Sequence, residues 1–351
     1  MMRRLPIYFL VDVSESMIGE PIEQVQNGIK TIIQSLRTDP YALEYVYVSV
    51  IVFAGKAKTL VPLTELMGFY PPTLPIGGGT SLGNVMNFLM DDIDCSIRKT
   101  TKEQKGDWKP IIYLFTDGNP TDNPAKAFQR WNEKYRTHCN LIAVSIGDNV
   151  DTQLLGNITS DVLKLKDADE YSFKAFFKWV TDSIRSSAIS VLDSATDELK
   201  LSSIDGINLE KVDTNQRCNV DENFAVLMGK CQTTKRSYLI KYAKRLKSLE
   251  LAGIEAFNVV DFKLVGAYPV DEKAYKDLLD DSKNNININT MELCGVPTCP
   301  CCGNQFGFVV CECGNIFCVG EEIQNKCPWC GLEGTLGDGD SRGMTVNRTR
   351  G

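Results

Sequence analysis

The stretch IYFLVDVSES, residues 7–16, decides the fold class of this chain. Its first part, Ile7–Val13, is an apolar run that predicts a buried strand, and a helix is expected to begin near Pro21, where apolar residues start to recur with helical spacing. Asp12 lies near the end of this run, and Ser14 and Ser16 lie between the run and the helix. A buried strand that leads through a polar loop into an amphipathic helix is typical of a doubly wound α/β sheet.

The same alternation of strands and helices continues to about residue 192. Four further buried or half-buried strands are expected, at Tyr45–Phe53, Ile111–Phe115, Leu141–Gly147 and Val162–Leu165. A hairpin at residues 54–57 should place the segment KTLVPL antiparallel at the sheet edge, a position that suits Pro62. We therefore predict a Rossmann-like, mostly parallel sheet of six strands, in a domain over residues 4–192.

Two more polar motifs follow this pattern. Thr80, in GGGTSL, precedes a predicted helix, and Asp117, in TDG, follows the strand Ile111–Phe115. Loops at the carboxyl ends of parallel strands meet at one edge of the sheet. Carboxylates and hydroxyls offer only oxygen, which suits Mg²⁺, Mn²⁺ or Ca²⁺. The sequence predicts a Mg²⁺ site of five residues: Asp12, Ser14, Ser16, Thr80 and Asp117. Helix capping and an Asx turn are the alternative roles for these residues taken singly.

Cysteines are concentrated near the end of the chain, where nine of the 13 lie between Cys294 and Cys330. Such clustering without a secretion signal favours metal chelation over disulfides. The knuckles CPCCG and CPWCG predict a zinc site formed by Cys299, Cys302, Cys327 and Cys330. A second site could use Cys294, Cys311, Cys313 and Cys318, which would leave Cys301 spare. Spacing alone leaves open a crossed pairing, and whether one or two zinc ions are bound.

The remaining segments are less regular. Residues 194–290 have short strand-like runs and are expected to form a small α+β connecting part, followed by a cysteine-rich, zinc-ribbon-like module over residues 291–334. Residues 335–351 have few apolar groups and are expected to be a disordered tail. The basic run Lys235–Lys247 alternates with apolar residues, so we interpret it as the solvated face of a strand and a helix.

Composition restricts the classes of partner. The net charge of −7 argues against tight binding to nucleic acid or to an anionic membrane. No window reaches the roughly 18 apolar residues that span a bilayer. The amino-terminal apolar run resembles a signal peptide only until Asp12 interrupts it. We therefore expect a cytoplasmic protein that binds other proteins.

The motifs DVSESM, GGGTSL and TDG resemble the metal-ion-dependent adhesion site of von Willebrand factor A domains. That resemblance implies direct contact of Ser14, Ser16 and Thr80 with the metal, and contact of the two aspartates partly through water. With the cysteine-rich end, the chain resembles the TerY family of tellurium-resistance and stress-response proteins. This second resemblance implies a bacterial cytoplasmic adaptor, with a protein kinase and a metal-dependent protein phosphatase as partners.

The function expected from these features is a non-enzymatic interaction, in which Mg²⁺ takes an exposed Asp or Glu of a partner, flanked by Glu15 and the loop Met67–Ile76. One alternative is a Mg²⁺-dependent hydrolase or phosphoryl-transfer enzyme, which the position of the only histidine, His138, weakens because it is expected at the opposite sheet edge. The other is a zinc ribbon that binds nucleic acid through tail arginines. Acidic neighbours weaken it.

Overall fold

The structure is a computed structural model of the chain. It describes residues 3–102, 104–117, 119–146, 152–165, 170–193, 209–210, 223–249, 257–279, 286–320, 324–335 and 343–349. Gly118 of the predicted metal loop and the tail arginines Arg342 and Arg350 lie outside the described residues. Packing divides the chain into two compact units: residues 1–13, 20–74 and 80–219 form the first, and residues 14–19, 75–79 and 220–351 form the second.

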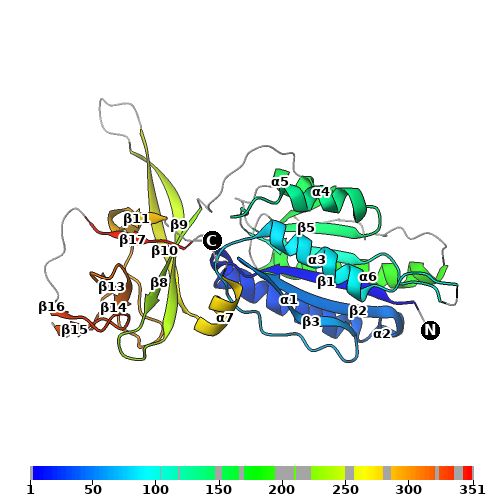
Figure 1. Cartoon of the computed structure of the whole chain (residues 1–351), viewed down its shortest axis with the longest axis horizontal. Coiled ribbons are helices and arrows are strands. Elements are labelled where there is room, and N and C mark those ends of the chain that lie inside the picture. The colour runs from blue at the N-terminus through cyan, green and yellow to red at the C-terminus, as the bar shows by residue number, and fades with distance from the viewer. Residues whose placement is uncertain are drawn as a thin grey trace. The chain divides into compact units, whose positions relative to one another are not determined.

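A seven-stranded sheet forms the centre of the first unit, in the order β3-β2-β1-β4-β5-β6-β7 (Figure 1). Its strands are β1 (Leu5–Asp12), β2 (Val46–Phe53), β3 (Ala57–Glu65), β4 (Ile111–Thr116), β5 (Asn140–Ile146), β6 (Asp161–Leu165) and β7 (Leu209–Glu210). Neighbours from β2 to β6 are parallel, and the edge strands β3 and β7 are antiparallel. The predicted fold class and antiparallel edge strand are confirmed. Strand β7 was not predicted, because two residues carry no periodicity.

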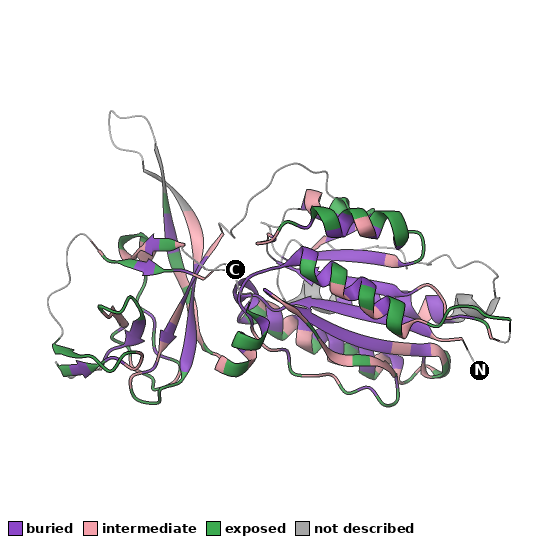
Figure 2. Cartoon of the chain, viewed as in Figure 1, coloured by how far each residue is buried: buried purple, intermediate pink, exposed green. Residues whose placement is uncertain are grey.

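Helices cover both faces of this sheet: α1 (Glu20–Leu36), α2 (Pro40–Tyr45), α3 (Leu82–Ser96), α4 (Ala125–Lys134), α5 (Thr152–Gly156) and α6 (Glu170–Asp193). The short 3₁₀ turn at Glu15–Met17 belongs to the second unit. Tyr8 and Leu10 of β1 face the core shared with α3 and α4. On the other face, the rings of Phe115 and Phe177 lie 5.9 Å apart, under α6. Every residue of β1 and β4 is buried for this reason (Figure 2).

A six-stranded sheet forms the second unit, in the order β12-β10-β9-β8-β14-β13. Its strands are β8 (Phe224–Lys230), β9 (Ser237–Leu249), β10 (Phe257–Pro269), β12 (Leu293–Cys294), β13 (Phe308–Val310) and β14 (Ile316–Cys318). Two small ribbons pair β11 (Asn287–Asn289) with β17 (Thr345–Asn347) and β15 (Gln324–Lys326) with β16 (Glu333–Thr335). The unit also contains the helix α7 (Glu272–Leu278) and a 3₁₀ turn at Thr290–Glu292. One sheet therefore runs across the predicted boundary between residues 290 and 291.

Two expectations about the second unit were wrong. The tail is ordered in part, because β17 pairs with β11 and buries Val346 in the core. The basic run also contains no helix: Lys235 and Arg236 belong to the turn before β9, and the remainder is a single long strand in which Lys241 is buried. None of the described helices is both long and apolar enough to cross a membrane.

Candidate metal centres

The two aspartates of the predicted oxygen site lie at neighbouring strand ends. Asp12 is the last residue of β1, and Asp117 directly follows β4, which pairs with β1 in parallel. The two strands are held in register at this point, because the Thr116 hydroxyl donates a 2.6 Å hydrogen bond to Asp12 Oδ2. Both carboxylates are therefore fixed at the carboxyl edge of the sheet, as the sequence predicts.

Thr80 is fixed at the same edge by its backbone. Its amide donates to Thr121 Oγ1 at 3.0 Å, and its carbonyl accepts from the Thr121 amide at 2.7 Å, in the loop after β4. Its own hydroxyl oxygen is buried and has no hydrogen-bond partner in the described part of the chain. A buried polar group left without a partner costs about 1–3 kcal/mol. A bond from Oγ1 to a metal ion would offset that cost.

Ser14 and Ser16 follow Asp12 along the chain and flank the start of the 3₁₀ turn. Ser14 occupies the position before the turn, yet its side chain makes no capping hydrogen bond. Instead, the two hydroxyls share a 2.9 Å hydrogen bond and are fully buried. Adjacent ligands of an octahedral Mg²⁺ at 2.0–2.1 Å are about 2.9 Å apart. The serine pair thus fits the edge of such an octahedron.

Glu15 does not have the role expected for it. The sequence places it beside a contact surface, but its side chain is buried in the second unit. Its carboxylate accepts a 2.8 Å hydrogen bond from the Gly79 amide and another from the Tyr275 hydroxyl. In the same unit, the buried ammonium group of Lys241 donates to the carbonyls of Ser16 and Ile18. These bonds hold the turn that carries the two serines.

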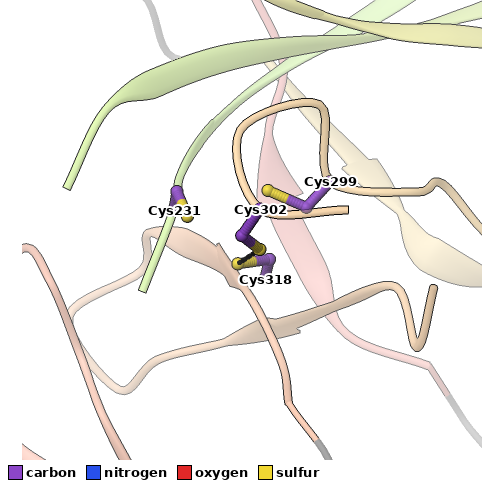
Figure 3. A group of neighbouring side chains, drawn as sticks. All are labelled: Cys231, Cys299, Cys302 and Cys318. Carbon is purple, nitrogen blue, oxygen red and sulfur yellow. Dashed lines mark hydrogen bonds between the residues drawn. The ribbon is translucent and has the colours of Figure 1, made fainter. Parts of the chain in front are cut away.

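Eight cysteines of the second unit come together in two groups of four. The first consists of Cys231, Cys299, Cys302 and Cys318 (Figure 3), and the second of Cys311, Cys313, Cys327 and Cys330. Within each group all four sulfur atoms lie within 4.8 Å of one another. The structure therefore offers two sites with four sulfur ligands each, one for each of two zinc ions.

The sulfur separations match the geometry of tetrahedral zinc. With Zn–S bonds of 2.3 Å, two sulfurs of one tetrahedron are about 3.8 Å apart. The distances are 3.8 Å between Cys302 and Cys318, 3.6 Å between Cys311 and Cys330, and 3.9 Å between Cys313 and Cys327. Four sulfurs at these distances leave no open position for water, so the sites fit a structural role.

The ligand pairing differs from the one predicted. The knuckles at residues 299–302 and 327–330 do not share a zinc site, and Cys318 does not join Cys311 and Cys313. The hairpin of β13 and β14 explains this, because Phe308 pairs with Cys318 at its open end while Cys311 and Cys313 lie in its turn. Three residues of strand separate the two ends, about 10 Å. The two groups are interleaved along the chain, as in the crossed alternative left open by the spacing, but that alternative did not include Cys231.

Cys231 is a ligand that the sequence prediction missed. It directly follows β8, whose parallel pairing of Lys230 with Phe317 of β14 brings it level with Cys318. Its turn closes with a hydrogen bond from the Lys235 amide to the Cys231 carbonyl, as the Gly303 amide does for Cys299. Lys235 has a φ of 59° and is the only non-glycine residue with a positive φ among the described residues. The equivalent position in the knuckle of Cys299 is occupied by Gly303. Because this turn lacks the glycine of the other knuckles, the sequence did not identify it as a knuckle.

The surroundings of individual thiols favour metal binding, which requires thiolates. Burial alone would raise the pKa of Cys231, but hydrogen bonds from the side chain and backbone of Thr234 outweigh it and lower this pKa to about 7. The Asn315 side chain likewise lowers the pKa of Cys313 to about 7. Each group therefore contains one thiol that is ready to lose its proton near neutral pH.

Two cysteines of the cluster region stay outside both groups. Cys294, predicted as a ligand, lies on β12, and its thiol donates to Asp261 Oδ2 at 3.4 Å. Cys301 packs against the core of the second unit, and it was expected to be spare. Among the described cysteines neither belongs to a group of four sulfurs. The ligand set predicted around Cys294 is thus corrected.

Family models identify both units. The model of the von Willebrand factor type A domain matches residues 7–177, and the model of the TerY-C metal binding domain matches residues 221–351. The chain is therefore a von Willebrand factor A protein with a carboxyl-terminal metal-binding domain. This pair of domains, in this order, places it in the TerY family, in agreement with the sequence motifs.

Solved structures resemble parts of the chain. Proximal thread matrix protein 1 from the mussel byssus is 17% identical over 51% of this chain and 48% of its own, with a TM-score of 0.39. BatB from Bacteroides thetaiotaomicron is 17% identical over 52% of this chain and 98% of its own, with a TM-score of 0.36. The ArnB paralog VWA2 from Sulfolobus acidocaldarius is 10% identical over 80% and 70%, with a TM-score of 0.37. The chain thus matches about half the length of the mussel protein.

Proposed function

We propose that this protein is a non-enzymatic, metal-dependent adaptor, which grips an exposed Asp or Glu of a partner protein through Mg²⁺ in the oxygen site. Bound there, Mg²⁺ would act as a Lewis acid that coordinates one carboxylate oxygen of the partner. The direct ligands would be the neutral hydroxyls of Ser14, Ser16 and Thr80, which leave the positive charge of the ion poorly compensated. An anionic oxygen from a partner would complete the site.

The observation that carries this proposal is the buried, unpartnered hydroxyl oxygen of Thr80. Buried polar groups are usually paired, and this unpartnered oxygen lies at the same edge of the sheet as Asp12 and Asp117. The 2.9 Å separation of the Ser14 and Ser16 oxygens supports the same reading. Mn²⁺ or Ca²⁺ could occupy the same oxygen set, and Mg²⁺ is preferred for its octahedral edge.

The predicted border loop, Met67–Ile76, begins at the sheet edge opposite Asp12, because β3 runs antiparallel to β2 and ends beside the start of that strand. Met67 is 63% exposed and Tyr70 is 77% exposed, although both are large and apolar in part. The Arg37 guanidinium lies 5.9 Å from the Tyr70 ring centroid and donates to three carbonyls of the same loop. Met67 and Tyr70 thus lie at the amino edge, and neither they nor the buried Glu15 border the oxygen site as the sequence predicted.

The sulfur sites would support this function structurally. Their closed ligand sets fit zinc ions that hold the second unit together, which then serves as a scaffold for another contact. The TerY family context suggests a cytoplasmic phosphorylation-signalling system of bacterial chemical stress, with tellurite as one stress. The partners would then be a protein kinase and a metal-dependent protein phosphatase.

Two observations bear on the alternatives. His138 lies just before β5, at the amino edge of the sheet, so it cannot serve as a base beside Ser14 or Ser16. Among the tail arginines, Arg348 is only 9% exposed and donates to the Phe224 carbonyl at 2.6 Å, so it is not available to a phosphate backbone. An adaptor therefore remains the function we favour over an enzyme or a nucleic-acid binder.

Metal titration of the full chain tests the proposal. Thr80→Val keeps the side-chain volume and removes the hydroxyl, so calorimetric affinity for Mg²⁺ and Mn²⁺ should fall at least tenfold. Thr31→Val, at an exposed threonine of α1, is the matched control and should bind as the parent does. Equal metal affinity in all three chains would reduce the oxygen cluster to a structural feature.

Partner capture from lysate, read by mass spectrometry, follows with the same three chains. A chelator is unsuitable here, because it would also remove zinc. We expect a kinase or phosphatase to be retained by the parent and Thr31→Val chains in Mg²⁺, and lost with Thr80→Val. Identical capture by all three would contradict metal-dependent gripping.

A further inference from the structure

A hollow of about 660 Å³ opens at the amino ends of the strands of the first unit, the edge opposite Asp12 and Asp117. Its walls come from the residues just before β1, β4 and β5 and from the carboxyl ends of α3 and α4. Binding sites for small organic molecules commonly measure about 300–1,000 Å³. The hollow thus has the size of such a site, and it lies at the opposite sheet edge from the aspartates of the oxygen site.

Positive charge dominates its lining. Six cationic side chains face two carboxylates: Arg3, Arg98, Lys99, Lys109, Arg130 and Lys134 against Asp94 and Asp107. The chain as a whole has a net charge of −7, so this excess is local. The carboxyl ends of α3 and α4 add about half a negative charge each, which is too little to cancel it.

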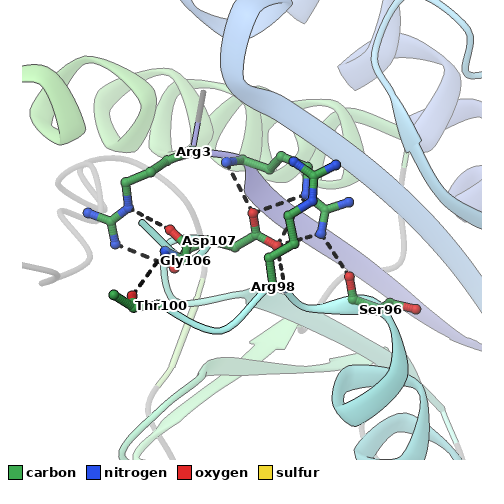
Figure 4. Close-up of polar contacts among 7 residues, drawn as sticks. Arg3, Ser96, Arg98, Thr100, Gly106 and Asp107 are labelled. Atoms are coloured by element: carbon green, nitrogen blue, oxygen red, sulfur yellow. Dashed lines mark hydrogen bonds and ion pairs between the residues drawn. The ribbon is translucent and has the colours of Figure 1, made fainter. Parts of the chain in front are cut away.

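The two carboxylates are already engaged. Asp107 accepts from Arg4 Nε at 3.0 Å and from the Arg98 amide at 2.8 Å, and its side chain is 1% exposed (Figure 4). Asp94 accepts from the Tyr135 hydroxyl at 2.5 Å and lies 3.8 Å from Lys99.

Three cations are left over. Arg130 pairs with Asp91 at 2.7 Å, and Arg3 donates to the carbonyls of Gly106 and Asp107. No described carboxylate forms an ion pair with Arg98, Lys109 or Lys134. Glu103 is not among the described residues. A multiply charged anion is the ligand that three unpaired cations around one hollow would attract.

Two hydrogen bonds connect the two ends of the loop that carries Arg98. The Asp107 amide donates to the Arg98 carbonyl at 2.9 Å, and the Gly106 amide donates to Thr100 Oγ1 at 2.9 Å (Figure 4). Gly106 is required here, because a Cβ atom at this position would lie 2.6 Å from the Thr100 nitrogen. These bonds position the backbone that carries Arg98 at the border of the hollow.

The floor of the hollow is apolar. Ile93, Tyr135 and Cys139 are buried beneath it. At its border the Arg3 guanidinium lies 4.6 Å from the centroid of the Trp108 ring, which presents an aromatic surface beside a cation. A simple inorganic anion would make no use of these groups, whereas a ligand with an organic part would.

We propose that this hollow binds a phosphorylated small molecule of nucleotide size. Its phosphates would lie among Arg98, Lys109 and Lys134, and its organic part would rest on the apolar floor. Arginine and lysine are the side chains that proteins use for phosphate groups, through charge-assisted hydrogen bonds. The site would provide the protein with a small-molecule input that is separate from its metal-dependent grip.

Calorimetric titration of the full, zinc-loaded chain with ADP, without Mg²⁺, tests this proposal. The variant Arg98→Glu/Lys134→Glu changes two exposed side chains of the hollow and should weaken ADP binding at least tenfold. Lys126→Glu/Lys178→Glu makes the same change of charge at exposed positions of the same unit outside the hollow and should bind as the parent does. Circular dichroism confirms that each variant is folded.

Further probes identify what is recognised. Pyrophosphate should compete with ADP and adenosine should not. Thr80→Val should bind ADP as the parent does, which separates this site from the oxygen site. The proposal is overturned by the absence of saturable ADP binding, by equal losses in both double variants, or by adenosine binding as tightly as ADP. It is also overturned if a phosphoserine peptide or single-stranded RNA binds at least tenfold more tightly than ADP.

Discussion

Replacing Cys231 with serine should remove one of two zinc ions from this protein. The change exchanges a single sulfur for oxygen in the group that also contains Cys299, Cys302 and Cys318. A serine hydroxyl is a poor substitute for a thiolate on zinc. Cys294→Ser and Cys301→Ser are matched controls, because both cysteines are nearby and lie outside the two groups.

The expected magnitude follows from the ligand count. Structural zinc contributes about 10–16 kcal/mol in small zinc-dependent domains. An equal share for each of four sulfurs is about 2.5–4 kcal/mol, which lowers zinc affinity by roughly two to three orders of magnitude. The total stability of a domain is only about 5–15 kcal/mol. Loss of this zinc should therefore also release β14 and its hairpin partner from β8, and expose Ile316 and Phe317.

Native mass spectrometry counts the bound zinc, and competition with a chromophoric chelator measures its affinity. We expect two zinc ions in the parent, Cys294→Ser and Cys301→Ser chains, and one in Cys231→Ser. One zinc in Cys294→Ser together with two in Cys231→Ser would refute the reasoning, because it would restore the ligand set that sequence spacing suggested. Two zinc ions in every variant would refute the requirement for four sulfurs.

Three further outcomes concern the first unit. Gly28→Ala should destabilise the chain by about 1–3 kcal/mol in urea unfolding, the usual cost of overpacking, because the added Cβ would lie 2.0 Å from the Phe177 ring; unchanged stability would contradict the tight packing of α1 on α6. Arg4→Met should cost about 3–5 kcal/mol in the same assay, since it leaves Asp107, 1% exposed, without its guanidinium partner. Burial raises the pKa of Cys139 to about 12, more than nearby Lys109 lowers it. Iodoacetamide at pH 8 should modify exposed Cys95 and spare Cys139. Alkylation of both thiols at equal rates would contradict the burial of Cys139. The stability that the Cys139 thiol contributes below pH 9.0, its ordinary pKa, is lost as the pH rises toward 12.

Sequence periodicity predicted the first unit well because parallel strands covered on both faces are uniform apolar runs. Ile7–Val13 and Ile111–Phe115 could be placed in this way, and the polar residues that follow them were assigned to one edge by topology alone. What the sequence could not reveal is the state of individual side chains. Glu15 reads as a solvent-facing residue of a metal loop, and only tertiary packing buries it against Gly79.

The second unit was harder to predict because its order depends on long-range pairing. Spacing identified the knuckles at 299–302 and 327–330 but not their partners, since a ligand is selected by strand register and not by sequence distance. Cys231 stands 68 residues before Cys299 and lacks the glycine that marks the other knuckles. Val346 was assigned to a disordered tail because a single apolar residue carries no local signal, yet it fills a place in the core.

The pairing of β8 with β14 has a consequence for how the protein is made. Cys231 leaves the ribosome 87 residues before Cys318, so the first sulfur site cannot close until most of the carboxyl-terminal half has been synthesised. Until then, the strands β8, β9 and β10 lack β14, the strand that pairs with β8. In a cell short of zinc, a nascent chain would expose this unpaired edge to proteases and to other unfolded chains. The abundance of the intact protein would then depend on the zinc supply during translation.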